Sequence, residues 1–231
     1  MTPLLEVSDL KVRIGSSQIL HGVGLTVAHQ GVTALLGRNG AGKTTTLKAV
    51  LGLVPRTGRV RLGDEELSGL PTHAIVRRGL GYAPEDRNVF AALTVTENLQ
   101  LAARGSGPHH YDLVYDMFPE LETRGRQRAG SLSGGQQQMV AIGRTLLNDN
   151  RLLLVDEPTK GLAPKIVTEV ADVLARAAQK VPILLVEQNL ALVRRIADHA
   201  VVLEQGGVVH TSPAADLLTD ADLTRELLGV A

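Results

Sequence analysis

Cysteine and tryptophan are absent from this 231-residue chain, and aromatic residues make up only 2% of it. Without cysteine, the chain has no disulfide, no thiolate chemistry and no cysteine-based zinc site. With so few aromatic rings, we expect no stacking platform for single-stranded nucleic acid. The core must therefore be built from aliphatic side chains, chiefly Leu, Val, Ile and Ala.

An excess of charge is lacking as well, because 24 Lys and Arg residues balance 24 Asp and Glu residues. A neutral chain has no overall electrostatic footprint for a phosphate backbone, so no nucleic-acid partner is expected. No apolar run approaches the ~20 residues that cross a bilayer, and the N-terminal pattern is not that of a secretory signal. If the chain serves a membrane process, another chain must supply the membrane span.

Short aliphatic strands alternate with helical segments along most of the chain. This alternation predicts an α/β fold with a mostly parallel sheet covered on both faces. The middle of the chain, about residues 85–150, reads instead as a mostly helical lobe. Strands are predicted at 4–7, 10–14, 20–27, 32–36, 80–83, 152–155, 183–186 and 200–203, and helices at 43–51, 72–78, 94–103, 111–117, 134–147, 164–178 and 190–197, with a loop at 105–110 and a helical tail from 212.

A glycine-rich loop joins the apolar strand at 32–36 to the helix that follows it. Its sequence, GRNGAGKT, fits the pattern G-x-x-x-x-G-K-[ST], in which backbone N–H groups wrap the phosphates of a nucleotide. We expect Lys43 to reach the β- and γ-phosphates and the Thr44 hydroxyl to ligate Mg²⁺. The predicted nucleotide-binding residues here are Gly37, Arg38, Asn39, Gly40, Ala41, Gly42, Lys43, Thr44 and Thr45.

Two neighbouring acids follow the aliphatic strand at 152–155. Ligands in open α/β sheets sit at the carboxyl ends of the strands, which places Asp156 and Glu157 in the same crevice as the phosphate loop. Because successive residues point in different directions, the two acids can have different roles. We expect Asp156 to hold Mg²⁺ and Glu157 to accept a proton from an attacking water.

A third motif, LSGGQ at residues 132–136, opens a helix. Ser133 is a good N-cap, and the two glycines leave backbone N–H groups uncovered, so this helix start is a second anion site.

Across nearly its whole length, the sequence resembles the ABC ATPase family. The phosphate loop resembles the Walker A motif, LSGGQ the family signature and LLLVDEP the Walker B motif, in matching order and spacing. The resemblance implies a P-loop NTPase (RecA-like) fold with an N-terminal antiparallel β region and an inserted helical signature lobe. It implies one nucleotide-binding domain over 1–231, with a core of about 1–84 and 151–231 and a lobe of about 85–150.

The resemblance also implies ATP and Mg²⁺ as cofactors and a head-to-tail pairing of two such domains. In that pairing, the signature of one chain contacts the γ-phosphate held by the other. The residues implied in this role in trans are Ser133, Gly134, Gly135 and Gln136.

Within the family, four segments are similar to the ATPases of branched-chain amino-acid importers: GYAPEDRNVFAALTVTENL, LSGGQQQMVAIGRTL, GLAP and LLVEQN. This implies integral membrane permease subunits, an external solute-binding protein and a peripheral location on the cytoplasmic face of the membrane. Urea-importer ATPases are near relatives, and the sequence does not separate the two groups.

Three positions depart from the general family pattern. Glu85 stands where most relatives have Gln, and either side chain offers an oxygen to Mg²⁺. Gln188 stands where most have a switch histidine, and it cannot gain a proton near neutral pH. Ile14 replaces the aromatic residue that stacks on adenine, so only apolar contact remains. These changes bear on turnover more than on ATP binding.

Two other functions remain compatible with the sequence. One is a soluble ABC ATPase outside transport, although such proteins usually carry tandem nucleotide domains or long coiled coils. The other is a weakly hydrolysing nucleotide switch, which Gln188 and Ile14 favour and Glu157 opposes.

Overall fold

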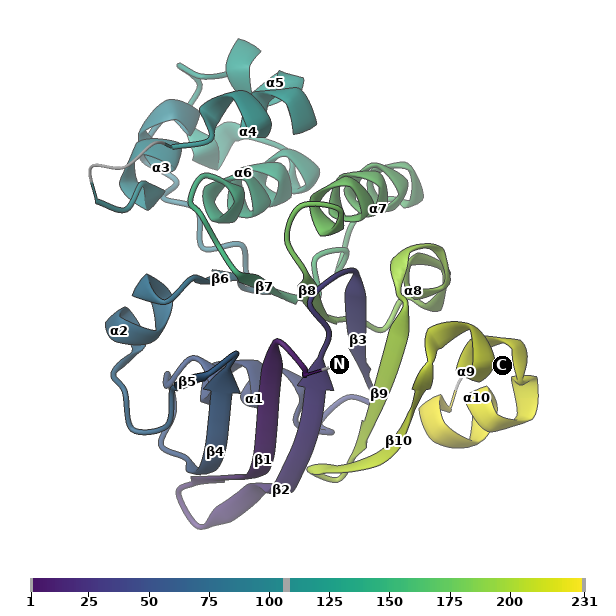
Figure 1. Cartoon of the computed structure of the whole chain (residues 1–231). Coiled ribbons are helices and arrows are strands. Elements are labelled where there is room, and N and C mark those ends of the chain that lie inside the picture. Colours follow the sequence, from purple (N-terminus) through teal and green to yellow (C-terminus); the bar gives the residue numbers. More distant parts are fainter. Residues whose placement is uncertain (1, 106–108, 230–231) are drawn as a thin grey trace.

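The computed structural model describes residues 2–105 and 109–229 and contains two β-sheets (Figure 1). A four-stranded sheet has the order β2-β1-β4-β5, and a six-stranded sheet has the order β10-β9-β3-β8-β7-β6. Helices pack against both sheets, and no helix in the described residues is long and apolar enough to cross a membrane. The predicted α/β fold, with an N-terminal antiparallel region and a mostly parallel sheet, is confirmed.

The smaller sheet is antiparallel and is built from β1 (Leu5–Ile14), β2 (Ser17–Val27), β4 (Thr57–Leu62) and β5 (Glu65–Glu66). The prediction of two separate strands at 4–7 and 10–14 was wrong, because β1 is continuous. The polar residues Ser8 and Asp9 interrupt the hydrophobic pattern where the strand bulges, and Asp9 has a left-handed φ of 50°. A bulge keeps a strand continuous while shifting its register, which the sequence pattern alone does not reveal.

The larger sheet contains β3 (Val32–Leu36), β6 (Leu80–Ala83), β7 (Leu152–Asp156), β8 (Ile183–Val186), β9 (His199–Glu204) and β10 (Gly207–Pro213). All its pairings are parallel except β9 with β10. The predicted helical tail from residue 212 begins instead at Ala214, after β10. Strand β10 was not predicted, because it lies at the sheet edge with no residue fully buried.

The helices form two groups. Those between the strands of the larger sheet are α1 (Lys43–Val50), α2 (Thr72–Arg77), α7 (Pro164–Ala178) and α8 (Leu190–Ile196), followed by α9 (Ala214–Thr219) and α10 (Ala221–Leu228). The others gather at the top of Figure 1: α3 (Val95–Ala102), α4 (Tyr111–Met117), α5 (Pro119–Thr123), the 3₁₀ turn Ala129–Ser131 and α6 (Gly134–Leu146). Residues 106–108 of the predicted loop lie outside the described residues.

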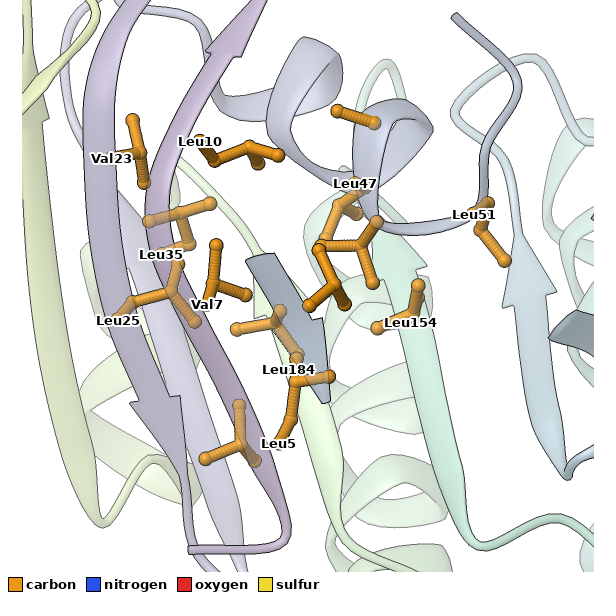
Figure 2. Close-up of a cluster of buried hydrophobic side chains, with 14 of the residues drawn as sticks. Leu5, Val7, Leu10, Val23, Leu25, Leu35, Leu47, Leu51, Leu154 and Leu184 are labelled. Atoms are coloured by element: carbon orange, nitrogen blue, oxygen red, sulfur yellow. The ribbon is translucent and has the colours of Figure 1, made fainter. Parts of the chain in front are cut away.

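The core is aliphatic, as the composition requires. One cluster fills the space between the antiparallel sheet, α1 and the larger sheet, and Figure 2 shows Leu10, Leu35 and Leu47 meeting there from β1, β3 and α1. A second cluster joins the other face of the larger sheet to α6 and α7. Strands β3, β7 and β8 are buried at every position, which holds their carboxyl ends and the loops after them in fixed positions.

Candidate nucleotide site

The phosphate loop connects β3 to α1, and two of its glycines are required by its shape. Gly37 has φ 142°, and a Cβ there would lie 2.2 Å from the backbone oxygen of Leu203. Gly42 is the N-cap of α1 at φ 104°, where a Cβ would lie 2.6 Å from the Leu20 side chain. The helix has no side-chain cap and no acid in its first turn, so its first N–H groups remain available to an anion.

Lys43 folds back over this loop. Its Nζ donates to the backbone oxygens of Gly37 at 2.8 Å and Arg38 at 3.1 Å. Burial lowers the pKa of Lys43, although the charges of Glu157 and Asp156 oppose this shift. The ammonium group therefore lies within the loop that precedes α1. The sequence predicted that Lys43 contacts the nucleotide phosphates from this loop.

The two acids after β7 lie in the same place. Asp156 is fully buried and accepts hydrogen bonds from Thr44 Oγ1 at 3.0 Å and from the Tyr82 hydroxyl at 3.3 Å. Burial raises the pKa of Asp156 to about 6, against the lowering effect of these two hydrogen bonds. The structure thus joins the phosphate loop and the carboxylate pair, which are far apart in the sequence.

Glu157 has a left-handed φ of 42° and a side chain that is 9% exposed. Its Oε1 accepts a hydrogen bond from Gln188 Nε2 at 2.5 Å, and its backbone N–H donates to Val186 at 2.9 Å. A left-handed φ is costly for a residue other than glycine and is found where the surroundings dictate the conformation, often at functional sites. The two residues predicted to be catalytic are therefore in direct contact.

The signature segment lies at the start of α6, away from the phosphate loop (Figure 1). Ser133 is the N-cap: its Oγ accepts from Gln136 N at 3.3 Å, and Gln136 Oε1 accepts from Ser133 N at 3.1 Å. Gly135 is buried, and a Cβ there would lie 2.7 Å from the Ile166 side chain of α7. Gly134 faces the Arg87 guanidinium instead.

Comparisons with known proteins agree with this geometry. The family model for ABC transporters matches residues 20–160, which contain the phosphate loop, the signature and the carboxylate pair. The chain belongs to the ABC transporter family. As a member, this ABC ATPase binds ATP and hydrolyses it to power transport.

Three curated relatives are similar over nearly the whole chain. The high-affinity branched-chain amino acid transport ATP-binding protein BraG of Pseudomonas aeruginosa is 39% identical, over 98% of this chain and all of its own length. The probable branched-chain amino acid transport ATP-binding protein LivF of Archaeoglobus fulgidus is 36% identical, over 98% of this chain and 99% of its own. The lipopolysaccharide export system ATP-binding protein LptB of Escherichia coli is 31% identical, over 97% of both chains.

Solved structures share the fold. The ADP conformation of an ATP-binding cassette of an ABC transporter has a TM-score of 0.82 at 24% identity, covering 97% of this chain and 98% of its own. An ATP-binding subunit of an ABC transporter has a TM-score of 0.81 at 30% identity, covering 95% of this chain and 94% of its own.

Two predicted site residues of the ABC ATPase lie outside the hydrogen-bonded centre. Ile14 ends β1 with 53% of its side chain exposed, and its contact with adenine stays a prediction. Glu85 follows β6 and makes an ion pair with Lys160. Glu85 is nonetheless close enough to affect the charge balance of Asp156 and Lys43.

Sequence reasoning missed Glu187, a carboxylate that is only 3% exposed. It accepts hydrogen bonds from the hydroxyl and the backbone N–H of Thr159 and from the backbone N–H groups of Gln188 and Asn189. Glu187 therefore fixes the loop carrying Gln188 against the turn after Glu157. The only sequence signal was an acid directly after the apolar strand at 183–186.

Proposed function

We propose that this ABC ATPase powers the import of branched-chain amino acids or a similar small solute. The observation that most supports the ATPase part of this proposal is the 3.0 Å hydrogen bond from Thr44 to Asp156, because it joins the carboxyl end of β7 to the phosphate loop. The substrate class rests on BraG and LivF, whose names specify branched-chain amino acid transport. Similarity to LptB, named for lipopolysaccharide export, indicates that family membership alone does not decide the substrate.

In this proposal, the phosphates of ATP lie over the phosphate loop. The free N–H groups at the start of α1 and the Lys43 ammonium supply positive charge, and the glycines let the backbone approach the phosphates. The residues assigned to nucleotide binding are those predicted: Ile14 at the base, and Gly37, Arg38, Asn39, Gly40, Ala41, Gly42, Lys43, Thr44 and Thr45 around the phosphates.

The donor set beside the loop fits Mg²⁺. Thr44 offers a hydroxyl oxygen, and Asp156 and Glu85 offer carboxylate oxygens, which are the hard ligands that Mg²⁺ prefers. In the described residues, no three His, Cys, Asp or Glu side chains are placed to enclose a metal by themselves. This fits an ion that takes much of its coordination from phosphates and water. When bound, Mg²⁺ neutralises phosphate charge during transfer.

Glu157 is the proposed general base. Its carboxylate is nearly buried but keeps one edge toward Lys160, and Gln188 holds Oε1 in position from the other side. Glu157 accepts the proton of the attacking water while Gln188 orients that water or the γ-phosphate. Because Gln188 does not titrate near neutral pH, it contributes no proton transfer of its own.

The α6 start is the proposed γ-phosphate contact in trans. Ser133 and Gln136 are at the exposed end of a helix without an acid in its first turn, so the N-terminal dipole is not neutralised. A second ATPase subunit, identical or related, would supply its phosphate loop to Ser133, Gly134 and Gly135. Closing this dimer couples ATP to movement of the membrane subunits.

A groove of about 450 Å³ suits a permease segment. Leu53, Tyr82, Ala102 and Arg144 line it, and the exposed side chains of Leu53 and Leu101 add apolar surface. It adjoins Glu85 through Pro84 and Arg87, so a helix seated there would contact the segment that leads to the metal ligands. We assign this docking to integral membrane permease subunits, with an external solute-binding protein and a position on the cytoplasmic face of the membrane.

Uptake measurements test the transport assignment. Cells lacking this chain are expected to lose uptake of labelled leucine, isoleucine and valine, and wild type is expected to restore it. Lys43→Ala should not restore uptake, whereas Lys48→Ala, on the exposed face of the same helix, should. Restored uptake of urea instead of amino acids would move the assignment to a urea-type importer, and purification with soluble partners only would remove the transporter role.

A second candidate is a weakly hydrolysing nucleotide switch, favoured by Gln188 in place of a titratable histidine. Turnover of the purified protein with Mg-ATP separates the two. If Glu157 is the base, Glu157→Gln lowers turnover by ~10²–10⁴-fold, a range typical for loss of a general base. Wild-type turnover already at background in the assembled transporter would favour the switch.

A further inference from the structure

Lys160 faces two of the carboxylates assigned above. Its Nζ hydrogen-bonds Glu85 and lies 3.5 Å from Glu157 Oε2. The two acids come from different parts of the chain, since Glu85 follows β6 and Glu157 follows β7. A single ammonium group therefore connects Glu85, in the segment before the helical region, to Glu157, the proposed general base.

The backbone of the same turn is held to the same segment. Arg87 Nη2 donates to the Lys160 backbone oxygen at 3.4 Å, and the guanidinium lies against Gly134 at the start of α6. Arg87 and Asn88 have left-handed φ values of 62° and 48°, and Arg87 Nε is buried without a partner in the described residues. These features mark a segment whose present conformation is held by its contacts and is not the least strained one.

We propose that Lys160 is a positioning residue that acts as an internal counter-ion for Glu85 and Glu157 before Mg²⁺ binds. The inference rests on the proposed function, which assigns Glu85 to the metal and Glu157 to the base. With Lys160 in place, a positive charge lies between the two carboxylates and reduces the repulsion between them. In this proposal Glu85 serves the ion through Oε1, the oxygen that Lys160 now holds, so this bond breaks when Mg²⁺ binds.

This exchange makes Mg²⁺ binding and the Glu85–Lys160 contact mutually exclusive. Glu85 leaves Lys160 when it turns toward the ion, and the contact between the two chain segments is then reduced to the Arg87 hydrogen bond. Arg87 also lies beside Gly134, so the remaining hydrogen bond connects this turn to the start of the signature helix. Lys160 thereby raises the Mg²⁺ concentration at which the nucleotide-bound form is reached.

The test is a Mg²⁺ titration of the full chain with a fluorescent, non-hydrolysable ATP analogue. Lys160→Met should lower the Mg²⁺ concentration at half-maximal binding by about 3-fold, the size expected from removing an exposed ion pair. Lys160→Arg, which keeps the charge, should leave the midpoint unchanged. Lys165→Met is the matched control, because it removes the same charge from an exposed residue five positions away.

The thermal unfolding temperature of the metal-free protein should be slightly lower in Lys160→Met than in wild type, because Glu85 and Glu157 then lack their counter-ion, and Lys160→Arg should match wild type. An unchanged Mg²⁺ midpoint in Lys160→Met, or a higher one, would overturn the counter-ion role. A wild type whose analogue binding does not depend on Mg²⁺ would overturn the metal site itself, and this inference with it. If analogue binding by the wild type depends on Mg²⁺, the proposed metal site stands even when Lys160→Met does not lower the Mg²⁺ midpoint.

Discussion

The starts of α1 and α6 are both proposed anion sites, but their side chains differ. At α1, Gly42 provides no side-chain cap and Lys43 supplies a full charge beside the uncovered N–H groups. At α6, Ser133 and Gln136 form a neutral capping box, and the cation beside the helix start, the Arg87 guanidinium next to Gly134, comes from another segment of the chain. A third helix, α3, has the same box with an acid, Glu97, in place of Gln136.

This difference indicates which of the two helix starts can bind phosphate within a single chain. The α1 start is open and charged, so it can bind phosphate within one chain. The α6 start is already satisfied locally and adds only its dipole, worth about 0.3–1 kcal/mol at an exposed site. In its proposed role it therefore depends on a nucleotide that another subunit already holds. In α3 the Glu97 carboxylate cancels the dipole, which leaves a purely structural cap.

Removing the charge at α1 should have the largest effect. Lys43→Ala is expected to weaken ATP binding by the isolated chain by about 100-fold, since hydrogen bonds to charged groups are worth about 1.5–3 kcal/mol each. Fluorescence titration with an ATP analogue measures this. Lys48→Ala should bind normally, and unchanged affinity in Lys43→Ala would contradict the phosphate-loop assignment.

Blocking the α6 start should leave the first site intact. Ser133→Arg is expected to abolish ATP-dependent dimerisation, measured by light scattering, without changing ATP affinity of the monomer. Thr94→Arg places the same side chain at the matching cap of α3, and it should cost stability while dimerisation persists. Loss of monomer ATP binding in Ser133→Arg would be inconsistent with a role in trans.

Converting the α6 box into the α3 box should be milder. Gln136→Glu puts a carboxylate at the anion site and is expected to weaken ATP-dependent dimerisation by about 10-fold. Gln136 Nε2 also donates to Glu120 at 2.9 Å, so the exchange is best made together with Glu120→Gln. The reverse change in α3, Glu97→Gln, serves as the control. If both exchanges changed ATP-dependent dimerisation equally, the proposed difference between α6 and α3 would be wrong.

The smallest effect concerns the acid beneath α1, which has no counterpart at α6. Because the folded pKa of Asp156 is about 6 and the ordinary pKa of an Asp side chain is 3.8, folding favours the protonated form. Stability therefore falls as pH rises from about 4 to about 6, and the full cost persists above pH 6. Asp156→Asn should stabilise the metal-free protein by about 1 kcal/mol at pH 7.5.

At pH 4 this gain should be much smaller, because Asp156 is then protonated in the folded state and only partly ionised in the unfolded state. Urea unfolding at the two pH values measures the difference. A gain that is equal at both would show that the effect of the substitution is not electrostatic.

The sequence predicted the centre of the site because its features are local. A buried strand, a glycine loop and a helix start at Lys43 are adjacent in the chain, and the aliphatic run before Asp156 marks another buried strand. Features that depend on partners distant in sequence were missed. Glu187 and Lys160 look like ordinary acids and bases until the fold brings Thr159 and Glu85 to them.

The same reasoning explains the errors in the fold. Strand β10 lies at an edge, so its alternation of half-buried and exposed residues gave only a weak signal. The break assigned within β1 came from Asp9, whose left-handed backbone is compatible with a continuing strand. The division into a core and an inserted lobe at residues 85–150 stays a prediction.

The hairpin between β9 and β10 supports the phosphate loop from the other end of the chain. Gly206 donates to Ala41 at 3.0 Å and accepts from His21 at 2.8 Å, while Leu203 closes the space beside Gly37. During synthesis, the loop sequence emerges long before this hairpin and before β8 and β9, the two strands that pair with β3. A nascent chain is thus expected to acquire its ability to hold nucleotide only after β9 and β10 have been synthesised.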